Sequence, residues 1–217
     1  MNKENKNKTD SPYYLRLSFR LWLLIILFLI LTYEICTWWT VSMDSSVYDF
    51  LMNNIHPDFT QLFIAFTNLW WTYWIIILAV LLTIVLWLKK ENRKFAIISF
   101  LTPIIIMIIN TVVKNIVQRP RPEILRLVSE TWYSFPSWHT MHTIALYWLI
   151  ILLASYFVKN RWLRRVIYLL SLLIMLWVTS SRIYLWVHYF SDILWWFLLS
   201  LVYLFVIKHF FFTKKVA

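Results

Sequence analysis

Long apolar runs separated by short polar segments make up most of this chain. A helix of about 20 apolar residues crosses the roughly 30 Å hydrocarbon layer of a bilayer, and these runs are close to that length. We expect six of them to be transmembrane helices, near residues 17-38, 62-88, 95-117, 138-158, 163-181 and 190-212, with the fifth the shortest. The pattern predicts an all-α polytopic membrane protein with six transmembrane helices.

The chain ends have a different composition from the apolar runs. Residues 1-15 are rich in Lys, Asn, Glu and Ser and are expected to form a disordered cytoplasmic tail. No cleavable signal peptide is expected, because the first apolar run is too long and lacks a small-residue cleavage site. A six-helix membrane domain over 16-213 and a short cytoplasmic tail over 214-217 complete the predicted organisation.

Composition agrees with a membrane protein and narrows the classes of partner. The 217 residues are 61% hydrophobic and 14% charged, with a mean hydropathy of +0.67, which is too apolar for a soluble domain. A net charge of +11 could indicate nucleic acid in a soluble protein, but in a membrane protein the positions of the charges matter more than their sum. We expect membrane lipids as partners and no nucleic acid. Cys36 is the single cysteine, which excludes an intramolecular disulfide.

The Lys and Arg residues are distributed unequally along the chain. Sixteen of the 21 lie in the N-terminal tail and first helix start, the 89-94 loop, the 159-165 loop and the C-terminus. Six spans would put these four segments on one side of the membrane. The positive-inside rule makes that side cytoplasmic, so both termini are predicted to be cytoplasmic.

The other five cations fall on or near the predicted outer face, where topology does not require positive charge. They are Lys114, Arg119, Arg121, Arg126 and Arg182. The predicted outer loop 39-61 holds three aspartates and no Lys or Arg, so the outer cations are concentrated elsewhere. This distribution indicates an anion site at the outer membrane surface. Snorkelling of Lys114 and binding of lipid headgroups by the arginines remain alternatives.

The first candidate motif lies at the end of the third run. Lys114 and Arg121 are seven residues apart, so they would project from one face, two turns apart, if the helix continues that far. They could then hold one anion together. Pro122 is expected to end the helix, leaving 123-135 to cross the outer surface.

The second candidate motif, Pro136-Ser137-Trp138-His139, directly precedes the fourth run. Ser137 is a plausible N-cap, and the free N–H groups of a first helical turn, together with the helix dipole, can bind a phosphate oxygen. His139 would lie beside the bound group. Simple capping with an interfacial histidine is the alternative.

The third candidate motif contains Ser181-Arg182, His188 and Asp192. An aspartate four residues after a histidine can accept the N–H of one imidazole nitrogen, which leaves the other nitrogen free to attack. Such a pair often occurs by chance. The convergence of three anion-binding fragments at three outer helix ends is less easily explained by chance.

The combined spacing closely resembles the three-part pattern of the type 2 phosphatidic acid phosphatase family. The first part is Lys114, six intervening residues and Arg121-Pro122, and the second is Pro136-Ser137-x-His139. The third is Ser181-Arg182, five residues, His188, three residues and Asp192. Arg119-Pro120 overlaps the first part but lacks the family spacing from Lys114.

The resemblance implies a role for each matched residue. His188 would be the nucleophile that forms a phosphohistidine, Asp192 would orient it, and His139 would be the general acid. The phosphate-binding groups would be Lys114, Arg121, Ser137, the backbone at Trp138, and Arg182. The family needs no metal or other cofactor, and no carboxylate cluster suited to a metal is visible in the sequence.

The resemblance also implies a substrate class. The expected activity is hydrolysis of a lipid phosphomonoester or diphosphate at an active site that faces the outside. The bacterial members that this short chain resembles act on undecaprenyl diphosphate, phosphatidylglycerol phosphate or phosphatidic acid. A channel or transporter is disfavoured, because the polar residues cluster at one face and form no path across the bilayer.

Tryptophan stands where the family has glycine in the second motif. The backbone N–H at this position approaches the phosphate, so the indole of Trp138 is expected to fill or distort the site. The chain contains no glycine and 15 tryptophans, including Trp186 and Trp195-Trp196 at positions where relatives commonly have glycine. We hypothesise that many glycines of a parent sequence are replaced by tryptophan. An aromatic belt explains only some of them. The alternative function is a catalytically inactive relative that binds lipid phosphate.

Overall fold

The computed structural model describes residues 11–37, 39–69, 72–122, 127–128 and 130–208. Helices account for most of these residues, and no strand occurs among them. In chain order the elements are α1 (Ser11–Cys36), α2 (Val41–Met52), α3 (Pro57–Leu69), α4 (Thr72–Trp87), the 3₁₀ turn η1 (Lys90–Asn92), α5 (Arg93–Val117), α6 (Trp138–Phe157), α7 (Arg161–Tyr184) and α8 (Phe190–Ile207). The predicted all-α fold is confirmed.

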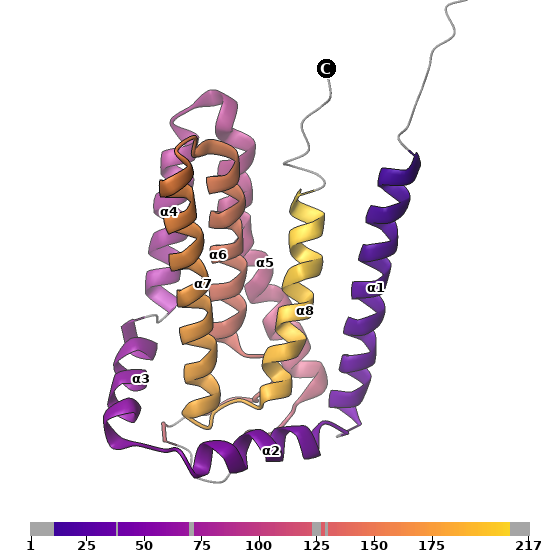
Figure 1. Ribbon diagram of the computed structural model, residues 1–217, viewed down its shortest axis with the longest axis vertical. Coiled ribbons are helices and arrows are strands. Elements are labelled where there is room, and N and C mark those ends of the chain that lie inside the picture. Colours follow the sequence, from indigo (N-terminus) through magenta and orange to yellow (C-terminus); the bar gives the residue numbers. More distant parts are fainter. Residues whose placement is uncertain (1–10, 38, 70–71, 123–126, 129, 209–217) are drawn as a thin grey trace, which may run out of the picture.

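Helix α6 lies at the centre of a helical bundle. It contacts α4, α5, α7 and α8, while α1 packs against α8 on the outside. Figure 1 shows these long helices aligned with the long axis of the molecule, with α2 lying across one end. Met141, Ile144 and Ala145 of α6 are fully or almost fully buried and belong to the main core, which fixes the position of the α6 N-terminus.

Four of the predicted membrane helices are confirmed as helices long and apolar enough to cross a bilayer. They are α5, α6, α7 and α8. The prediction that the fifth run gives the shortest helix is wrong, because α7 has 24 residues and α8 has 18. Helix α7 extends beyond its apolar segment at both ends. Asn160 caps its start by accepting hydrogen bonds from the N–H groups of Trp162 and Leu163.

The first two runs differ more from the prediction. The segment Leu21–Cys36 and helix Val41–Met52 give a fifth candidate span only if this pair, bent by 80°, is counted as one. The run 62-88 contains most of α3 and all of α4, and residues 70–71 between them lie outside the described residues, so one continuous helix stays a prediction. Helix α4 by itself has 16 residues and is about 24 Å long, shorter than the hydrocarbon layer. A count of six spans therefore stays a prediction.

The two ends of the bundle carry different groups. The 89-94 and 159-165 loops lie at the end opposite α2, whereas the three candidate motifs lie at the α2 end (Figure 1). Helix α1 begins at Ser11, inside the predicted tail 1-15, and the predicted outer loop 39-61 contains α2. The predicted tail 214-217 and Arg126 lie outside the described residues. Which end faces the cytoplasm stays a prediction.

Candidate active site

The end of α5 differs from the predicted geometry. The helix stops at Val117, because Gln118 adopts the left-handed conformation with φ 49° and its N–H bonds to the Lys114 carbonyl. A left-handed residue ends an α-helix, and Pro120 cannot donate a helical hydrogen bond two residues later. The predicted end of the run at 117 is confirmed, but the condition for Lys114 and Arg121 to share one helical face is not met, and the expectation that Pro122 ends the helix is wrong.

Lys114 and Arg121 nevertheless converge on the same segment. The Lys114 ammonium donates to the Tyr133 carbonyl at 2.8 Å, and the Arg121 Nε donates to the neighbouring Trp132 carbonyl. Arg121 Nη1 also donates to the Val187 carbonyl at 2.8 Å. Both cations are buried. Backbone carbonyls hold them in place, and the Val187 carbonyl that accepts from Arg121 directly precedes His188 of the third motif.

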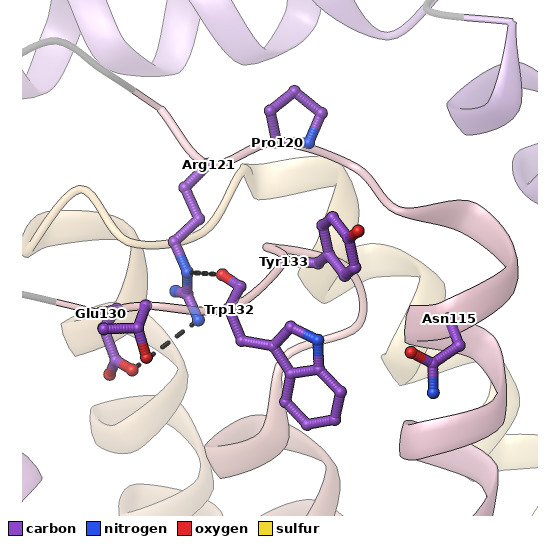
Figure 2. A pocket seen from close by; sticks show the side chains of 7 residues that line it. Asn115, Pro120, Arg121, Glu130, Trp132 and Tyr133 are labelled. Atoms are coloured by element: carbon purple, nitrogen blue, oxygen red, sulfur yellow. Dashed lines mark hydrogen bonds and ion pairs between the residues drawn. The ribbon is translucent and has the colours of Figure 1, made fainter.

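An open pocket lies beside Arg121. Its volume is about 520 Å³, and Figure 2 shows Arg121, Glu130 and Trp132 at its border. Asn115, Pro120, Thr131 and Tyr133 complete its lining. Arg121 therefore lines a pocket although only 8% of its surface is exposed.

Glu130 joins two of the predicted phosphate-binding cations. Arg182, in the last turn of α7 and 1% exposed, donates from Nη2 to Glu130 Oε1. Arg121 Nη2 lies 3.7 Å from the other oxygen of the same carboxylate. One carboxylate therefore bridges both guanidinium groups, in the way that a bound phosphate oxyanion could.

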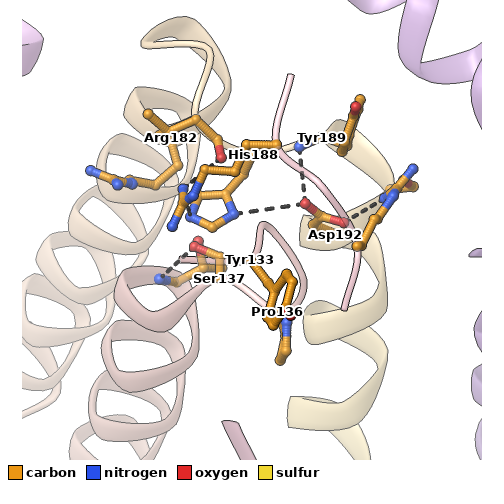
Figure 3. Close-up of polar contacts among 12 residues, drawn as sticks. Tyr133, Pro136, Ser137, Arg182, His188, Tyr189 and Asp192 are labelled. Atoms are coloured by element: carbon orange, nitrogen blue, oxygen red, sulfur yellow. Dashed lines mark hydrogen bonds and ion pairs between the residues drawn. The ribbon is translucent and has the colours of Figure 1, made fainter. Parts of the chain in front are cut away.

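Arg121 and Arg182 form a cationic group. His188 lies between this cationic group and Asp192 (Figure 3). Its Nε2 is 3.4 Å from Arg121 Nη1, and its Nδ1 is 3.7 Å from Asp192 Oδ2. A guanidinium can only donate, so Nε2 is assigned as the acceptor and Nδ1 as the protonated nitrogen. The carboxylate faces Nδ1 as predicted, but 3.7 Å is longer than the predicted hydrogen bond.

The protonation state of His188 follows from its surroundings. The side chain is 1% exposed, and burial lowers its pKa well below the ordinary value, with further lowering by Arg121 and Arg182. The imidazole is consequently neutral at pH 7. A neutral ring with its lone pair at Nε2 is the form that attacks an electrophile.

The start of α6 supplies the second motif. Ser137 is confirmed as the N-cap, since its hydroxyl accepts a hydrogen bond from the Thr140 N–H at 3.5 Å. His139 follows in the first turn and is 9% exposed. Within the described part of the chain its Nε2 is buried without a hydrogen-bond partner, so this atom has capacity for a substrate oxygen.

The indole of Trp138 lies away from the cationic group. Its ring packs against that of His142 with centroids 4.0 Å apart and planes tilted by 37°, and both residues line an apolar cavity of about 190 Å³ beside α4 and α5. None of the other residues lining this cavity belongs to the three motifs. Neighbouring helical residues point about 100° apart, so Trp138 and His139 leave different faces of α6. The expectation that this indole fills the site is wrong, and its alternative, a distortion of the site, stays a prediction.

Trp186 occupies a backbone conformation that favours glycine. Its φ is 59°, and its side chain is 1% exposed and stacked on Tyr48 with ring centroids 4.3 Å apart. A bulky residue at positive φ is unusual. The buried indole N–H groups of Trp148, Trp186 and Trp196 also have no hydrogen-bond partner among the described residues, although buried indoles usually find one. Both observations support the replacement of glycine by tryptophan.

Mass spectrometry of natively expressed protein tests this hypothesis. We expect an intact mass below the 26.6 kDa of this sequence, because glycine is lighter than tryptophan. Peptide mapping should find glycine at positions 138, 186, 195 and 196. Tryptophan at all four positions in an active native protein would contradict the hypothesis.

Three charged residues at this end of the bundle, Arg119, Asp44 and Glu130, were not assigned a role from the sequence. Arg119 donates to Asp192 Oδ1 through Nη1 and to Asp44 Oδ2 through Nη2 at 2.8 Å. The available signal was charge complementarity, since the aspartates of the 39-61 segment have no cation of their own while arginines lie at the same end. Glu130 gave no comparable signal.

Comparisons with known proteins agree with the fold. The PAP2 superfamily profile matches residues 95–215. Phosphatidylglycerophosphatase B of Bacillus subtilis (strain 168) is 35% identical over 107 residues, which cover 48% of this chain and 51% of that relative. The aligned region thus spans about half of the relative's length.

Two crystal structures have similar folds. That of the first transmembrane PAP2 type phosphatidylglycerolphosphate phosphatase from Bacillus subtilis matches with a TM-score of 0.77 at 25% identity, covering 92% of this chain and 100% of the other. Aquifex aeolicus LpxE matches with a TM-score of 0.58 at 22% identity, covering 76% of this chain and 93% of the other, and supports the fold alone.

The helical bundle, with four helices long and apolar enough to cross a bilayer, is that of a multi-pass membrane protein. The chain belongs to the PAP2 superfamily, which confirms the resemblance to type 2 phosphatidic acid phosphatases.

Proposed function

We propose that this protein is a lipid phosphatase that removes phosphate from a membrane lipid through a phosphohistidine intermediate, without a metal. One observation carries the proposal. His188 presents Nε2 toward Arg121 and Nδ1 toward Asp192 while buried beside the cationic group. These are the positions that a nucleophile, a phosphate-binding cation and an orienting carboxylate require.

In the first chemical step, the Nε2 lone pair of His188 attacks phosphorus and the bond from phosphorus to the leaving oxygen breaks. His139, which becomes protonated when the anionic phosphate binds beside it, gives its proton to that oxygen, which leaves as the lipid alcohol or phosphate. The phosphorylated imidazole keeps its Nδ1 proton and becomes cationic. Asp192, facing Nδ1, stabilises this charge.

In the second step, water attacks phosphorus and the bond to Nε2 breaks. His139, now neutral, accepts the proton from water, and inorganic phosphate leaves. Lys114, Arg121 and Arg182 stabilise the phosphoryl oxygens in both steps. These three buried cations supply the positive charge that a metal ion supplies in other phosphatases.

The substrate is a lipid phosphate, because the site lies at the helix ends where a headgroup can enter while its tail stays in the bilayer. Undecaprenyl diphosphate, phosphatidylglycerol phosphate and phosphatidic acid are the candidates. The name of the aligned Bacillus subtilis relative favours phosphatidylglycerol phosphate. The positive-inside rule supports an active site facing outside and cytoplasmic termini.

Phosphate release by the purified full chain in detergent micelles tests this function. Each candidate lipid is offered separately, with and without a strong chelator. We expect release from at least one lipid at a rate that the chelator leaves unchanged. Loss of activity in chelator would reject the metal-independent mechanism, and no release from any of the three lipids would reject this substrate range.

Glu130 competes with the substrate phosphate for the two arginines. Because its carboxylate bridges Arg182 and Arg121, it must be displaced before phosphate binds both. We expect Glu130→Gln to lower the inhibition constant of inorganic phosphate about tenfold, since the neutral amide is a weaker competitor. Inhibition by phosphate is measured in the release assay.

Asp49→Asn is the matched control for this variant, because Asp49 is an exposed carboxylate on α2. Its phosphate inhibition should equal that of the unchanged protein. A weaker inhibition by phosphate in Glu130→Gln would show that Glu130 assists phosphate binding and does not compete with it.

A further inference from the structure

A second ion-pair network lies behind His188, on the side away from the cationic group. Arg119 forms its centre, with one guanidinium nitrogen bonded to Asp192 Oδ1 and the other 2.8 Å from Asp44 Oδ2. Arg119, Asp44 and Asp192 are each no more than 2% exposed. Burial lowers the pKa of Arg119, but Asp192 and Asp44 outweigh this effect and raise it, so the guanidinium stays charged.

Ser191 closes this network. Its N–H and hydroxyl both donate to the Asp44 carboxylate, at 2.9 and 2.7 Å, and its Oγ lies 2.8 Å from Arg119 Nη1. Asp44 therefore holds both Arg119 and the first turn of α8, in which Asp192 lies. The two oxygens of Asp192 are also fixed separately, Oδ1 by Arg119 and Oδ2 by the Tyr189 N–H at 3.0 Å.

We propose that Arg119 and Asp44 are positioning residues, which hold the Asp192 carboxylate against Nδ1 of His188 and make this orientation depend on helix α2. The proposal rests on the proposed function for the role of His188. Neither residue lines the pocket beside Arg121. They act through Asp192, whose Oδ2 is turned toward His188 because Oδ1 is occupied by Arg119.

A second contact from α2 supports this dependence. Tyr48, one turn after Asp44 on the same helix, donates its hydroxyl to the His188 carbonyl at 3.0 Å. Tyr48 also stacks on Trp186, two residues before His188. Helix α2 thus contacts the backbone of His188 and the carboxylate behind its ring. A shift of α2 would move both together.

The kinetic test uses Asp44→Asn, which keeps the side-chain shape and removes the charge. We expect kcat for the lipid phosphate to fall about tenfold while KM changes less than about twofold, because outer residues that orient a reactive group affect the chemical step. Exposed Asp49 on the same helix gives the control, and Asp49→Asn should change neither constant. Rates are divided by the folded fraction from size-exclusion chromatography, so that a loss of folded protein does not lower the corrected kcat. An unchanged corrected kcat in Asp44→Asn would contradict the proposal.

A double-mutant cycle separates a shared role from two independent ones. With Arg119→Met, Asp44 no longer has a guanidinium to hold, so adding Asp44→Asn should lower kcat less than about twofold further. If the kcat of the double variant falls by the product of the two single-variant reductions, the proposal is overturned. If Arg119→Met fails to fold, Arg119→Lys replaces it in the test. Lysine keeps a charge between the two carboxylates but lacks the planar guanidinium that bridges them, so the kcat of Arg119→Lys should also fall.

Nitrogen NMR of the His188 ring tests the positioning without any turnover. In the unchanged protein and in Asp49→Asn, Nδ1 should carry the proton and Nε2 should be bare. In Asp44→Asn and Arg119→Lys the ring should show a mixture of both tautomers. An unchanged spectrum in these two variants overturns the positioning role. Absence of phosphate release by the unchanged protein overturns the proposed function instead, so the two failures are distinguishable.

Discussion

Replacing His188 by asparagine is expected to reduce kcat/KM for the lipid phosphate by about 10⁴-fold or more, because removal of a nucleophile leaves only the catalysis that binding provides. Asparagine is polar, and its amide fills part of the space that the imidazole occupies. The buried contacts of Tyr48 and Arg121 with this segment use the backbone carbonyls of His188 and Val187, and these remain in the variant. Phosphate release and the thermal unfolding midpoint are measured together.

His56→Asn provides the control, since its ring is 61% exposed and lies in the segment before α3. This variant should retain the activity of the unchanged protein. If His188→Asn keeps more than about one hundredth of the activity while folded, the ring is not the nucleophile and the proposed mechanism is wrong.

Replacing Arg182 by methionine is expected to reduce kcat/KM by about 10²- to 10³-fold, through loss of one preorganised cation at the phosphoryl oxygens. Arg182 is 1% exposed, and its Nη2 is bonded to Glu130. Methionine fills much of the same volume, so the loss is mainly electrostatic. The removal also leaves Glu130 with Arg121 as its remaining arginine partner among the described contacts, which should weaken phosphate binding further.

Arg161→Met is the matched control, because Arg161 is an exposed arginine at the opposite end of the same helix, α7. Its kcat/KM should stay within about twofold of the unchanged value. Equal losses in both variants would indicate a general effect of removing charge from α7 and would contradict a phosphate-binding role for Arg182.

Features that depend on local sequence were predictable. The apolar length of α5 to α8 follows from hydropathy, and the Ser137 cap follows from residue type at the start of an apolar run. The placement of His188 four residues before Asp192 also brought the two side chains together, although not at hydrogen-bond distance. Each of these features involves residues close in sequence.

Features that depend on tertiary contacts were missed. Arg119 and Asp44 are 75 residues apart, and their pairing is fixed by how α2 crosses the end of the bundle. Glu130 reaches Arg182 across 52 residues from a segment with no periodic pattern. The direction of the Trp138 indole was misjudged because the space beside α4 and α5 that receives it exists only in the packed bundle.

The most direct test of the central claim is trapping of the phosphoryl group on the protein. The full chain is mixed with phosphatidylglycerol phosphate carrying a ³²P-labelled terminal phosphate, quenched early in alkaline detergent and mapped by peptide digestion. We predict label on the peptide that contains His188, stable in alkali, released in acid and absent from His188→Asn. Phosphate release without bound label, or label that persists in His188→Asn, would contradict the account.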